Sequence, residues 1–514
     1  MSAVATVNRD AFAEARECFG GIETFLVSKE ACSLSESDLE RELEKRGREL
    51  MRQMLEAHLQ VRGPGEAAAP VKGSDGVERD EQRLHERGLE TVFGEVRIER
   101  AGYGASGVES LHPMDADLNL PQERYSHEVR RRVAREAAMG SFDEVVRTLK
   151  ETTGAPVGKR QVEELVIRAA EDFDAFYKER YQYRPAEQSG SILVMTADGK
   201  GVVMRRQDLR EKTKKKATGT QHKLLNRISR GEKRNAKRMA TVAGVYTVAP
   251  YERTAEDVLR CLAPQHEPEK PERPRPESKR VWASLEKEPE ELIQEAFREA
   301  RRRDPEGRKR WVALVDGNER QIKILKKCFR KEGDPALIVL DFIHVTERVW
   351  KAGLDFHREA SPELETWVSQ RLLAILKGRA AHVAAGMRRS ATLQKLDENA
   401  RQRVDSCADY LLNHTAYLHY DLYLKLGLPI ATGVIEGACR YLVKDRMERT
   451  GARWSLKGAE AVLRLRALRT CDDFNAYWRF HEEQEYRRNH VAGYADGQVT
   501  PVRGPAGRHL RSVK

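Results

Sequence analysis

The chain has few cysteines, and no two of them are spaced like the ligands of a zinc site. Seven cysteines are scattered over 514 residues without a Cys-x-x-Cys pair, which argues against the usual structural zinc cages. An odd, dispersed set of thiols is typical of a reducing compartment. The first residues, MSAVATVNRDAFAEARE, contain no apolar signal core, and no run approaches the roughly 20 apolar residues that span a bilayer. We therefore expect a cytoplasmic protein.

Length and charge narrow the class further. A chain of this length exceeds one compact core, so two to four domains are expected. Lysine and arginine number 92 against 81 acidic residues, which gives a formal net charge of +11, and 34% of the residues are charged. Such a balance favours a polyanionic partner, of which nucleic acid is the simplest. On charge alone, a protein with an unusually charged surface is an equally good interpretation.

The N-terminal part reads as helical. Residues 34–62 begin with a Ser-x-x-Asp capping signal and continue with leucines and methionines at helical spacing. The following stretch, GPGEAAAPVKGSDG at 63–76, has the composition of a flexible linker. Within 90–125, the alternation in ETVFGEVRIERAGY predicts a small hairpin.

Residues 141–170, SFDEVVRTLKETTGAPVGKRQVEELVIRAA, predict two amphipathic helices joined by a short Gly-Pro turn. This is the layout of a helix-turn-helix, in which the second helix reads DNA. Lys159, Arg160 and Gln161 stand at the start of that helix and are candidate DNA contacts. An ordinary helical hairpin has the same pattern, so the alternative stays open.

The middle of the chain alternates short apolar runs with helical segments. We interpret SILVMTADGK, GVVMRR, TVAGVYTV, WVALVDGN and ALIVLDFIHV as five strands of an α/β domain. Two segments interrupt it: a densely basic insert at 205–240, and a Pro-rich loop at 267–279 that we expect not to pack. The candidate phosphate contacts of the insert are Lys212, Lys214, Lys215, Lys216, Arg234, Lys237 and Arg238. From 346 to 430 nearly every pattern is helical.

Three aspartates stand where apolar runs end. Asp198 follows ILVMTA and precedes a Gly-Lys-Gly turn signal, Asp316 ends WVALV, and Asp341 ends ALIVL. Open α/β sheets place their ligands at such strand ends, although an Asp-Gly pair is often only a turn. Cutting and rejoining DNA needs two divalent ions about 3.5–4 Å apart, and Mg²⁺ prefers hard carboxylate oxygens. Acids from distant segments therefore predict a magnesium site, with Mn²⁺ as an alternative ion.

Several motifs together resemble the ISKra-type insertion-sequence transposases, a bacterial group of the DDE superfamily. The resemblance runs from about residue 90 to about 490, and it is carried by TADGKGVVMR, WVALVDGN, LDFIHVTERVWKA, TGVIEGACRYLVKDRMERTGARW and YWRFH. It implies an α/β ribonuclease-H-like catalytic core with an all-α insertion, plus a mainly helical N-terminal DNA-binding region. The first acid of the family ends the first core strand, the second ends the fourth, and a glutamate lies on a later helix. By position these are Asp198, Asp316 and Glu436.

The resemblance also implies an organisation and an activity. The expected segments are an N-terminal helical region with linker (1–76), a DNA-binding region (77–188), the first part of the core (189–345), the helical insertion (346–430), the last part of the core (431–490) and a basic tail (491–514). The activity is metal-dependent cleavage at transposon ends and strand transfer into target double-stranded DNA. A homodimer or larger oligomer on DNA is expected. A nuclease that cuts without joining, and a non-catalytic DNA-binding descendant, are the alternatives.

The remaining candidate residues flank these acids. Asp341 ends the fifth predicted strand, so we expect it to orient His344 or a bound water rather than to bind the metal, and it is the alternative second acid. His344 either assists the site in this way or is a packed core histidine. The basic residues that follow Glu436 are candidates for holding DNA phosphates, with a solvated helix face as the alternative. They are Lys444, Arg446, Arg449 and Arg453.

Overall fold

The computed structural model describes residues 11–182, 189–218, 236–262, 273–332, 337–449 and 451–503. These form two compact units. Unit 1 combines the chain up to Phe176 with the residues from Asp473 onward, and unit 2 comprises Tyr177–Asp472. No helix in these ranges has the length and apolar character needed to cross a membrane.

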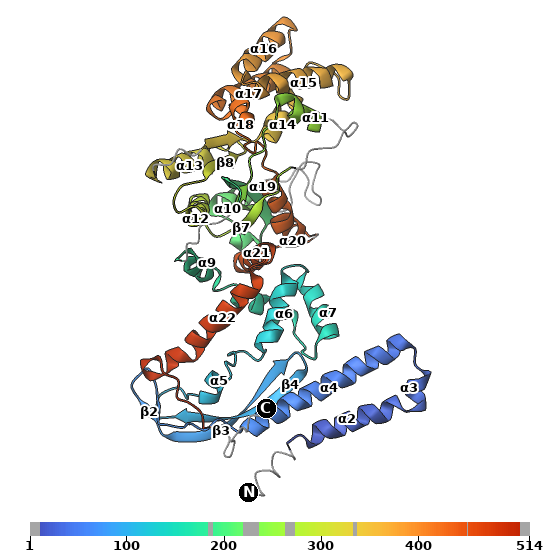
Figure 1. Cartoon of the computed structure of the whole chain (residues 1–514), viewed down its shortest axis with the longest axis vertical. Helices are drawn as coiled ribbons and strands as arrows, with labels where there is room; N and C mark the ends of the chain where they lie inside the picture. Colours follow the sequence, from blue (N-terminus) through green and yellow to red (C-terminus); the bar gives the residue numbers. More distant parts are fainter. Residues whose placement is uncertain are drawn as a thin grey trace. The chain divides into compact units, whose positions relative to one another are not determined.

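Unit 1 is built on a helical hairpin and a β-hairpin (Figure 1). Its elements are α2 (Ala13–Leu26), α3 (Lys29–Ser33), α4 (Glu36–Arg62), β1 (Val71–Lys72), β2 (Glu78–Arg79), β3 (Glu81–Thr91), β4 (Gly94–Gly104), α5 (Pro113–Asp117), α6 (His127–Ala137), α7 (Phe142–Thr152), α8 (Lys159–Ala169), the start of α9 (Phe173–Gln182), α22 (Phe474–Asn489) and two short 3₁₀ turns, η4 (Val491–Gly493) and η5 (Ala495–Gly497). The Ser35 side chain accepts the Asp38 N–H at the start of α4, which confirms the predicted cap.

The stretch expected to be a flexible linker is packed. The Ala67 N–H donates to the Tyr103 hydroxyl at 2.7 Å, and the Ala101 N–H donates to the Pro64 carbonyl at 2.8 Å. Ala67 belongs to a small core with Tyr103 and Tyr494. The prediction of a flexible linker was therefore wrong: glycine and proline here shape a path along β4. Tyr494 also shows that the described part of the expected tail, 491–503, is partly core.

The helix α22 belongs to unit 1, whereas the expected last core segment ran to residue 490. Arg130 on α6 is fully buried and bonds Glu485 of α22 with both terminal nitrogens, at 2.5 Å. The His481 imidazole bonds Asp172 at 2.7 Å. Because these charges are buried against one another, α22 is tied to the helices of unit 1, and the boundary falls at Asp472.

We predict that Arg130→Met lowers the free energy of unfolding of unit 1 by about 3–5 kcal/mol, because Glu485 is left buried without its guanidinium partner. Hydrogen exchange of α6 and α22 in the full chain, followed by mass spectrometry, measures this change. The matched control is Arg131→Met on the same helix. Arg131 is partly exposed and pairs with Glu128, so its loss should cost less than about 1 kcal/mol. Equal losses for the two variants would contradict the assignment.

Unit 2 contains a five-stranded mixed sheet. Its strands are β5 (Ile192–Val203), β6 (Lys237–Val248), β7 (Glu277–Ser284), β8 (Arg310–Val315) and β9 (Leu337–Leu340). The order across the sheet is β7-β6-β5-β8-β9. The pairs β5–β6 and β6–β7 are antiparallel, and β5–β8 and β8–β9 are parallel. In chain order the fourth strand therefore lies beside the first, and the fifth lies beyond the fourth.

Two of the predicted strands require correction. SILVMTADGK and GVVMRR form one continuous strand, β5, so Asp198 is not followed by a turn. Gly199 and Gly201 pair with Thr241 and Met239 of β6, and the missing side chains leave room for β6 side chains to cross over them. The true third strand is β7, whose first residues lie in the Pro-rich stretch that was expected not to pack. The basic insert consequently joins the first and second strands, not the second and third.

Helices cover both faces of the sheet. On one face, Trp311 of β8 packs on Phe297 of α12 (Pro289–Arg303), with ring centroids 5.4 Å apart. The other face carries α19 (Gly433–Ala438). A Cβ placed at Gly244 of β6 would lie 3.4 Å from Thr196 and 3.7 Å from Ile435 of α19. Side chains at positions 196 and 198 share a face of β5, so Asp198 points to the side that α19 covers.

A helical block follows β9, as expected for 346–430 (Figure 1, yellow to orange). It consists of α14 (Phe342–Gly353), α15 (Pro362–Leu376), α16 (Ala380–Leu393), α17 (Glu398–Asn413), the 3₁₀ turn η2 (Thr415–Tyr417) and α18 (Tyr420–Lys425). The remaining elements of unit 2 are the end of α9, the 3₁₀ turn η1 (Arg206–Asp208), α10 (Glu211–Thr218), α11 (Ala255–Leu262), α13 (Glu319–Glu332), the π-helical turn η3 (Cys439–Lys444), α20 (Asp445–Met447) and α21 (Leu456–Thr470).

Candidate active site

The three aspartates lie on neighbouring strands: Asp198 within β5, Asp316 directly after β8 and Asp341 directly after β9. Thr196 of β5 pairs with Leu314 of β8, so continuing this parallel register by two residues brings Asp198 opposite Asp316. Val315 of β8 pairs with Leu340 of β9, and one further residue brings Asp316 opposite Asp341. Parallel neighbours lie about 4.8 Å apart. Continued in this way, the two registers place the backbone of Asp316 between Asp198 and Asp341.

Asp198 and Asp316 keep carboxylate oxygens available. Both residues are half-buried. Asp198 accepts the Gly199 N–H at 2.6 Å and the Cys439 thiol at 3.3 Å, and a thiol is a weak donor. Asp316 Oδ1 accepts the Asn318 N–H at 2.8 Å. Within the described residues, Asp316 Oδ2 has no hydrogen-bond donor and neither aspartate forms an ion pair. Both carboxylates can therefore still bind a cation.

Asp341 is different, because four donors occupy its carboxylate. The residue is completely buried. Its Oδ1 accepts the N–H groups of Ile343, at 3.1 Å, and of Thr432, at 3.2 Å. Its Oδ2 accepts the Thr432 hydroxyl at 2.7 Å and the His344 Nδ1–H at 2.5 Å. The Ile343 bond also caps the start of α14. Asp341 therefore acts as an anchor between β9, α14 and the residues before α19.

His344 is held as a cation. Its hydrogen bond to Asp341 raises the pKa of His344 to about 9, against the opposing effect of burial, and the nearby Asp316 and Glu347 carboxylates add to the rise. The imidazole is therefore protonated at neutral pH, with Nδ1–H committed to Asp341. Nε2–H remains a donor, which suits an anionic oxygen better than a metal ion.

Glu436 lies on α19. Thr432, Glu436 and Cys439 are spaced by four and three residues, so they share one face of the helix. The Thr432 hydroxyl lies 2.7 Å from Asp341 Oδ2 and 3.2 Å from Glu436 Oε1. Cys439 donates to Asp198, and burial followed by the Asp198 charge raises the pKa of this thiol, so it stays protonated. One helix face thus contacts both outer aspartates and presents an exposed glutamate between these contacts.

Carboxylates near these contacts offer hard oxygen atoms of the kind that a divalent cation prefers. Among the described residues, one ligand atom each of Asp341, His344 and Glu436 lies within 4.8 Å of the others, whereas Asp198, Asp316 and Glu436 do not gather this closely. The four donors on Asp341 and the proton on His344 argue against the first trio as metal ligands. Asp198, Asp316 and Glu436 supply hard oxygen atoms, and none of the three pairs with a lysine or arginine in the described parts of the chain. Uncompensated carboxylates of this kind favour Mg²⁺ or Mn²⁺.

The basic residues after Glu436 divide into two groups. Lys444, Arg449 and Arg453 are exposed, as a phosphate contact requires. Arg446 is buried, with its guanidinium 4.7 Å from the centre of the Trp454 ring. The prediction of a DNA contact at Arg446 was therefore wrong, because this side chain packs inside unit 2.

The basic insert is described only in part, and Arg234 lies outside the described residues. Lys212, Lys215 and Lys216 are exposed near the start of the insert, and Lys214 is partly exposed and 3.6 Å from Glu211. Two other candidates, at the end of the insert, bond to other groups of unit 2. Lys237 pairs with Glu448 at 2.6 Å, and Arg238 donates to the Leu285 and Asp208 carbonyls. Arg238 is accordingly a structural residue of β6.

The predicted pair of helices in unit 1 is present as α7 and α8. Val145 and Leu149 of α7 and Val162 of α8 are buried. At the start of α8, Lys159, Arg160 and Gln161 are exposed. Lys159 pairs with Asp143 and Arg160 with Glu164, which are exposed pairs that a stronger anion can displace. Their exposure is compatible with DNA contact and also with a plain solvated surface.

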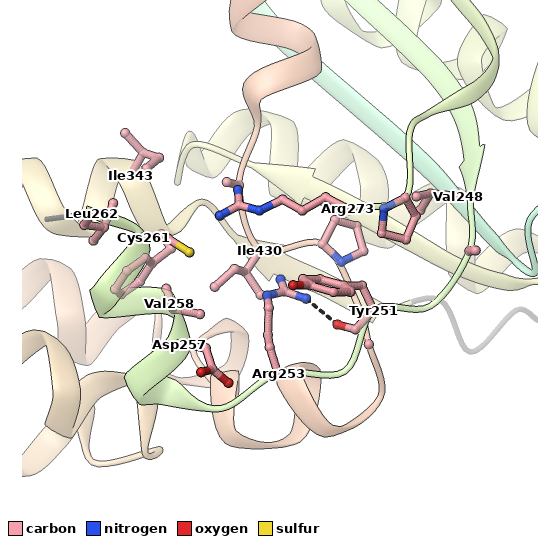
Figure 2. Close-up of a pocket in the computed structure, with 16 residues that line it drawn as sticks. Val248, Tyr251, Arg253, Asp257, Val258, Cys261, Leu262, Arg273, Ile343 and Ile430 are labelled. Carbon is pink, nitrogen blue, oxygen red and sulfur yellow. Dashed lines mark hydrogen bonds between the residues drawn. The ribbon is translucent and has the colours of Figure 1, made fainter. Parts of the chain in front are cut away.

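A separate cavity of about 280 Å³ lies beneath residues 427–431, the segment that leads to Thr432 (Figure 2). Val258, Leu262 and Ile430 form part of its apolar wall. Arg253 at its rim donates to the Tyr251 and Leu428 carbonyls, at 2.6 and 2.9 Å. None of the candidate acids lines this cavity, so it is not the place for the chemistry.

No protein-family model matches this chain, and a search of curated proteins also finds no match.

We predict that Thr432→Val lowers Mn²⁺ affinity about 10- to 100-fold, as the loss of a group that orients metal ligands typically does. Valine keeps the shape of the side chain, and the backbone N–H bond to Asp341 survives. Isothermal titration of the full chain with Mn²⁺ measures the change, and circular dichroism checks folding. Thr432→Ser restores the hydroxyl and should restore affinity. Wild-type affinity in the valine variant, or a serine variant as weak as valine, would contradict this role.

Proposed function

We propose that this chain is a DNA transposase that cuts at transposon ends and joins them to target DNA, with Asp198, Asp316 and Glu436 as the catalytic acids. The observation that carries the proposal is the convergence of three acids from distant segments. Asp198 and Asp316 fall opposite each other when the parallel register of β5 and β8 is continued by two residues, and Glu436 lies on the helix face whose Thr432 and Cys439 contact Asp341 and Asp198. The three acids are far apart in the sequence, so the tertiary structure brings them to the same part of unit 2.

The strand order also supports the proposal. The resemblance to DDE transposases expects the first and fourth strands to hold the two aspartates, and those strands, β5 and β8, are neighbours. The fifth strand carries Asp341, whose oxygens are occupied by donors. This distribution favours Asp316 as the second acid.

The chemistry of such a site follows from its donors. Asp198, Asp316 and Glu436 would hold one or two divalent cations, which when bound supply Lewis acidity at a phosphodiester. In cleavage, a water oxygen bonds to phosphorus and the bond to the 3′ oxygen breaks. In joining, the freed 3′-hydroxyl attacks a target phosphorus in the same way. The His344 Nε2–H can donate to a non-bridging phosphate oxygen, since its proton is retained at neutral pH.

The proposal is tested with the purified full-length chain, Mg²⁺ and DNA fragments that carry the sequences flanking its gene. Joined products would support a transposase. Products that are cut but never joined would indicate a nuclease, and a mobility shift without either would indicate a DNA-binding protein. Both of these outcomes would overturn the proposal.

We predict that Asp316→Asn abolishes cleavage in Mg²⁺ while DNA binding is kept, because a lost metal ligand removes chemistry and leaves phosphate contacts. Asp341→Asn should be less stable than wild type yet retain measurable cleavage, since Asp341 acts only through the groups that it anchors. Gel assays of cleavage and of binding measure both variants. An inactive Asp341→Asn beside an active Asp316→Asn would reverse the assignment.

A further inference from the structure

A groove of about 670 Å³ lies between α14 and α17 of the helical block. Arg348 and Lys351 line it from α14, and Gln402, Arg403 and Ser406 line it from α17. The site described above uses none of these residues. Leu354, Asp355 and Cys407 complete the lining. The cations among the lining residues are the groups that can bind the phosphates of an extended polyanion.

The cations of α14 form a line that begins at the candidate active site. His344, Arg348 and Lys351 are spaced by four and three residues, so they follow one another along a single face of the helix. His344 is bonded to Asp341 and lies close enough to Asp316 to respond to its charge. A strand bound along this line would thus pass from the carboxylates into the groove.

Arg348 is connected to the second acid through an aromatic ring. Its guanidinium lies 3.9 Å from the centre of the Tyr410 ring, and the Tyr410 hydroxyl donates to the Asp316 carbonyl at 3.1 Å. Tyr410 also explains Gly317, where φ is +93° and a Cβ would lie 2.8 Å from the Tyr410 hydroxyl. A guanidinium is planar by delocalisation, and stacking on a ring fixes its orientation, which leaves it ready for two parallel bonds to a phosphate.

The charge of the groove is only partly neutralised. Arg403 pairs with Asp355, and Lys351 lies 3.8 Å from Glu347, where both side chains are mostly exposed. Arg348 is exposed and forms no ion pair with any carboxylate that the structure describes. Among the groove residues, three cations face a single acid, Asp355. An exposed, unpaired guanidinium fixed on a ring is the strongest indication of an anionic ligand here.

We propose that this groove binds the phosphodiester backbone of a DNA strand next to the phosphate that is cut, with Arg348 and Lys351 as phosphate contacts. The inference rests on the proposed function for the identity of its ligand. The helical block, which lies between Asp316 and Glu436 in the sequence, would then also bind DNA.

The test compares two full-length variants that lose the same charge. Arg348→Gln with Lys351→Gln removes the groove contacts, and Arg389→Gln with Lys425→Gln removes two exposed cations elsewhere in the block. Fluorescence anisotropy with a labelled DNA duplex, over a range of salt concentrations without divalent ions, gives the salt dependence of binding. The groove variant should bind more weakly, and its slope of log affinity against log salt should flatten by about 1.8, for two lost phosphate contacts. The control should change much less.

A second measurement locates the DNA. A photo-cross-linking amino acid at Ser406, in the groove, should capture the labelled duplex, and one at His382, an exposed position on α16, should not. Equal slopes for the two double variants, or no cross-link at Ser406, would overturn the proposal. So would a cross-link abolished by inorganic phosphate at the same concentration as the DNA phosphates, which would indicate a site for an isolated phosphate.

The assay of cutting and joining and the assay of DNA binding together distinguish failure of the proposed function from failure of the groove assignment. If the wild type neither cuts nor joins DNA but the groove variant shows the flattened slope, the proposed function fails and the groove assignment stands. If the wild type joins DNA and the groove variant binds like the control, the groove assignment fails alone.

Discussion

The buried carboxylate of Asp341 holds the candidate active site together. A fully buried charge is tolerated only when donors surround it, and here two backbone N–H groups, one hydroxyl and one imidazolium do so. Each donor belongs to a segment that the site needs: the start of α14, His344, and Thr432 before α19. The position of Glu436 therefore depends on a carboxylate that has no oxygen left for a metal ion. Asp341 resembles a catalytic acid in sequence, and its burial makes it an anchor.

The three aspartates differ in solvent exposure, and this difference indicates which of them can bind a cation. Asp198 and Asp316 are half-buried and keep oxygens free of strong donors, so they can exchange water for a cation at small cost. Asp341 would lose well-formed hydrogen bonds in the same exchange. The π-helical turn at Cys439–Lys444 begins where α19, the helix of Glu436, ends, and such turns often occur at functional sites. Cys439 begins it and contacts Asp198, so the irregular turn and the outer aspartate are coupled.

Asp316 and Asp341 could be placed at strand ends from the sequence, because the end of an apolar run is a local feature, whereas Asp198 lies within β5 and not at its end. The order of the acids along the chain survived two errors in the strand assignment. GVVMRR was counted as a strand of its own, and β7 was missed behind the Pro-rich loop, so the two errors cancelled and Asp316 kept its place on the fourth strand.

Thr432, Cys439 and Tyr410 were not predicted. The first two have a signal, their spacing around Glu436, but Tyr410 acts across 94 residues, and only the tertiary structure brings it to Asp316. Arg446 and Arg238 were predicted as DNA contacts, but both have structural roles. Neighbouring residues in the sequence do not show that Arg446 is buried or that Arg238 bonds backbone carbonyls.

The helical block separates Glu436 from the three aspartates by a long segment of sequence. Hydrogen bonds where the block meets the sheet bring the two ends of this segment together. Asp341 and Thr432 are 91 residues apart in sequence, yet two hydrogen bonds join them, and the Phe342 N–H also donates to the Ile430 carbonyl at 2.8 Å. The chain therefore leaves the sheet and returns to it at one point. Because the entropy of closing a loop grows only with the logarithm of its length, a block closed in this way can vary in size at little cost to the geometry of Glu436. The same closure holds α14 against the strand ends, so any DNA contact on its exposed face stays at a constant distance from the acids.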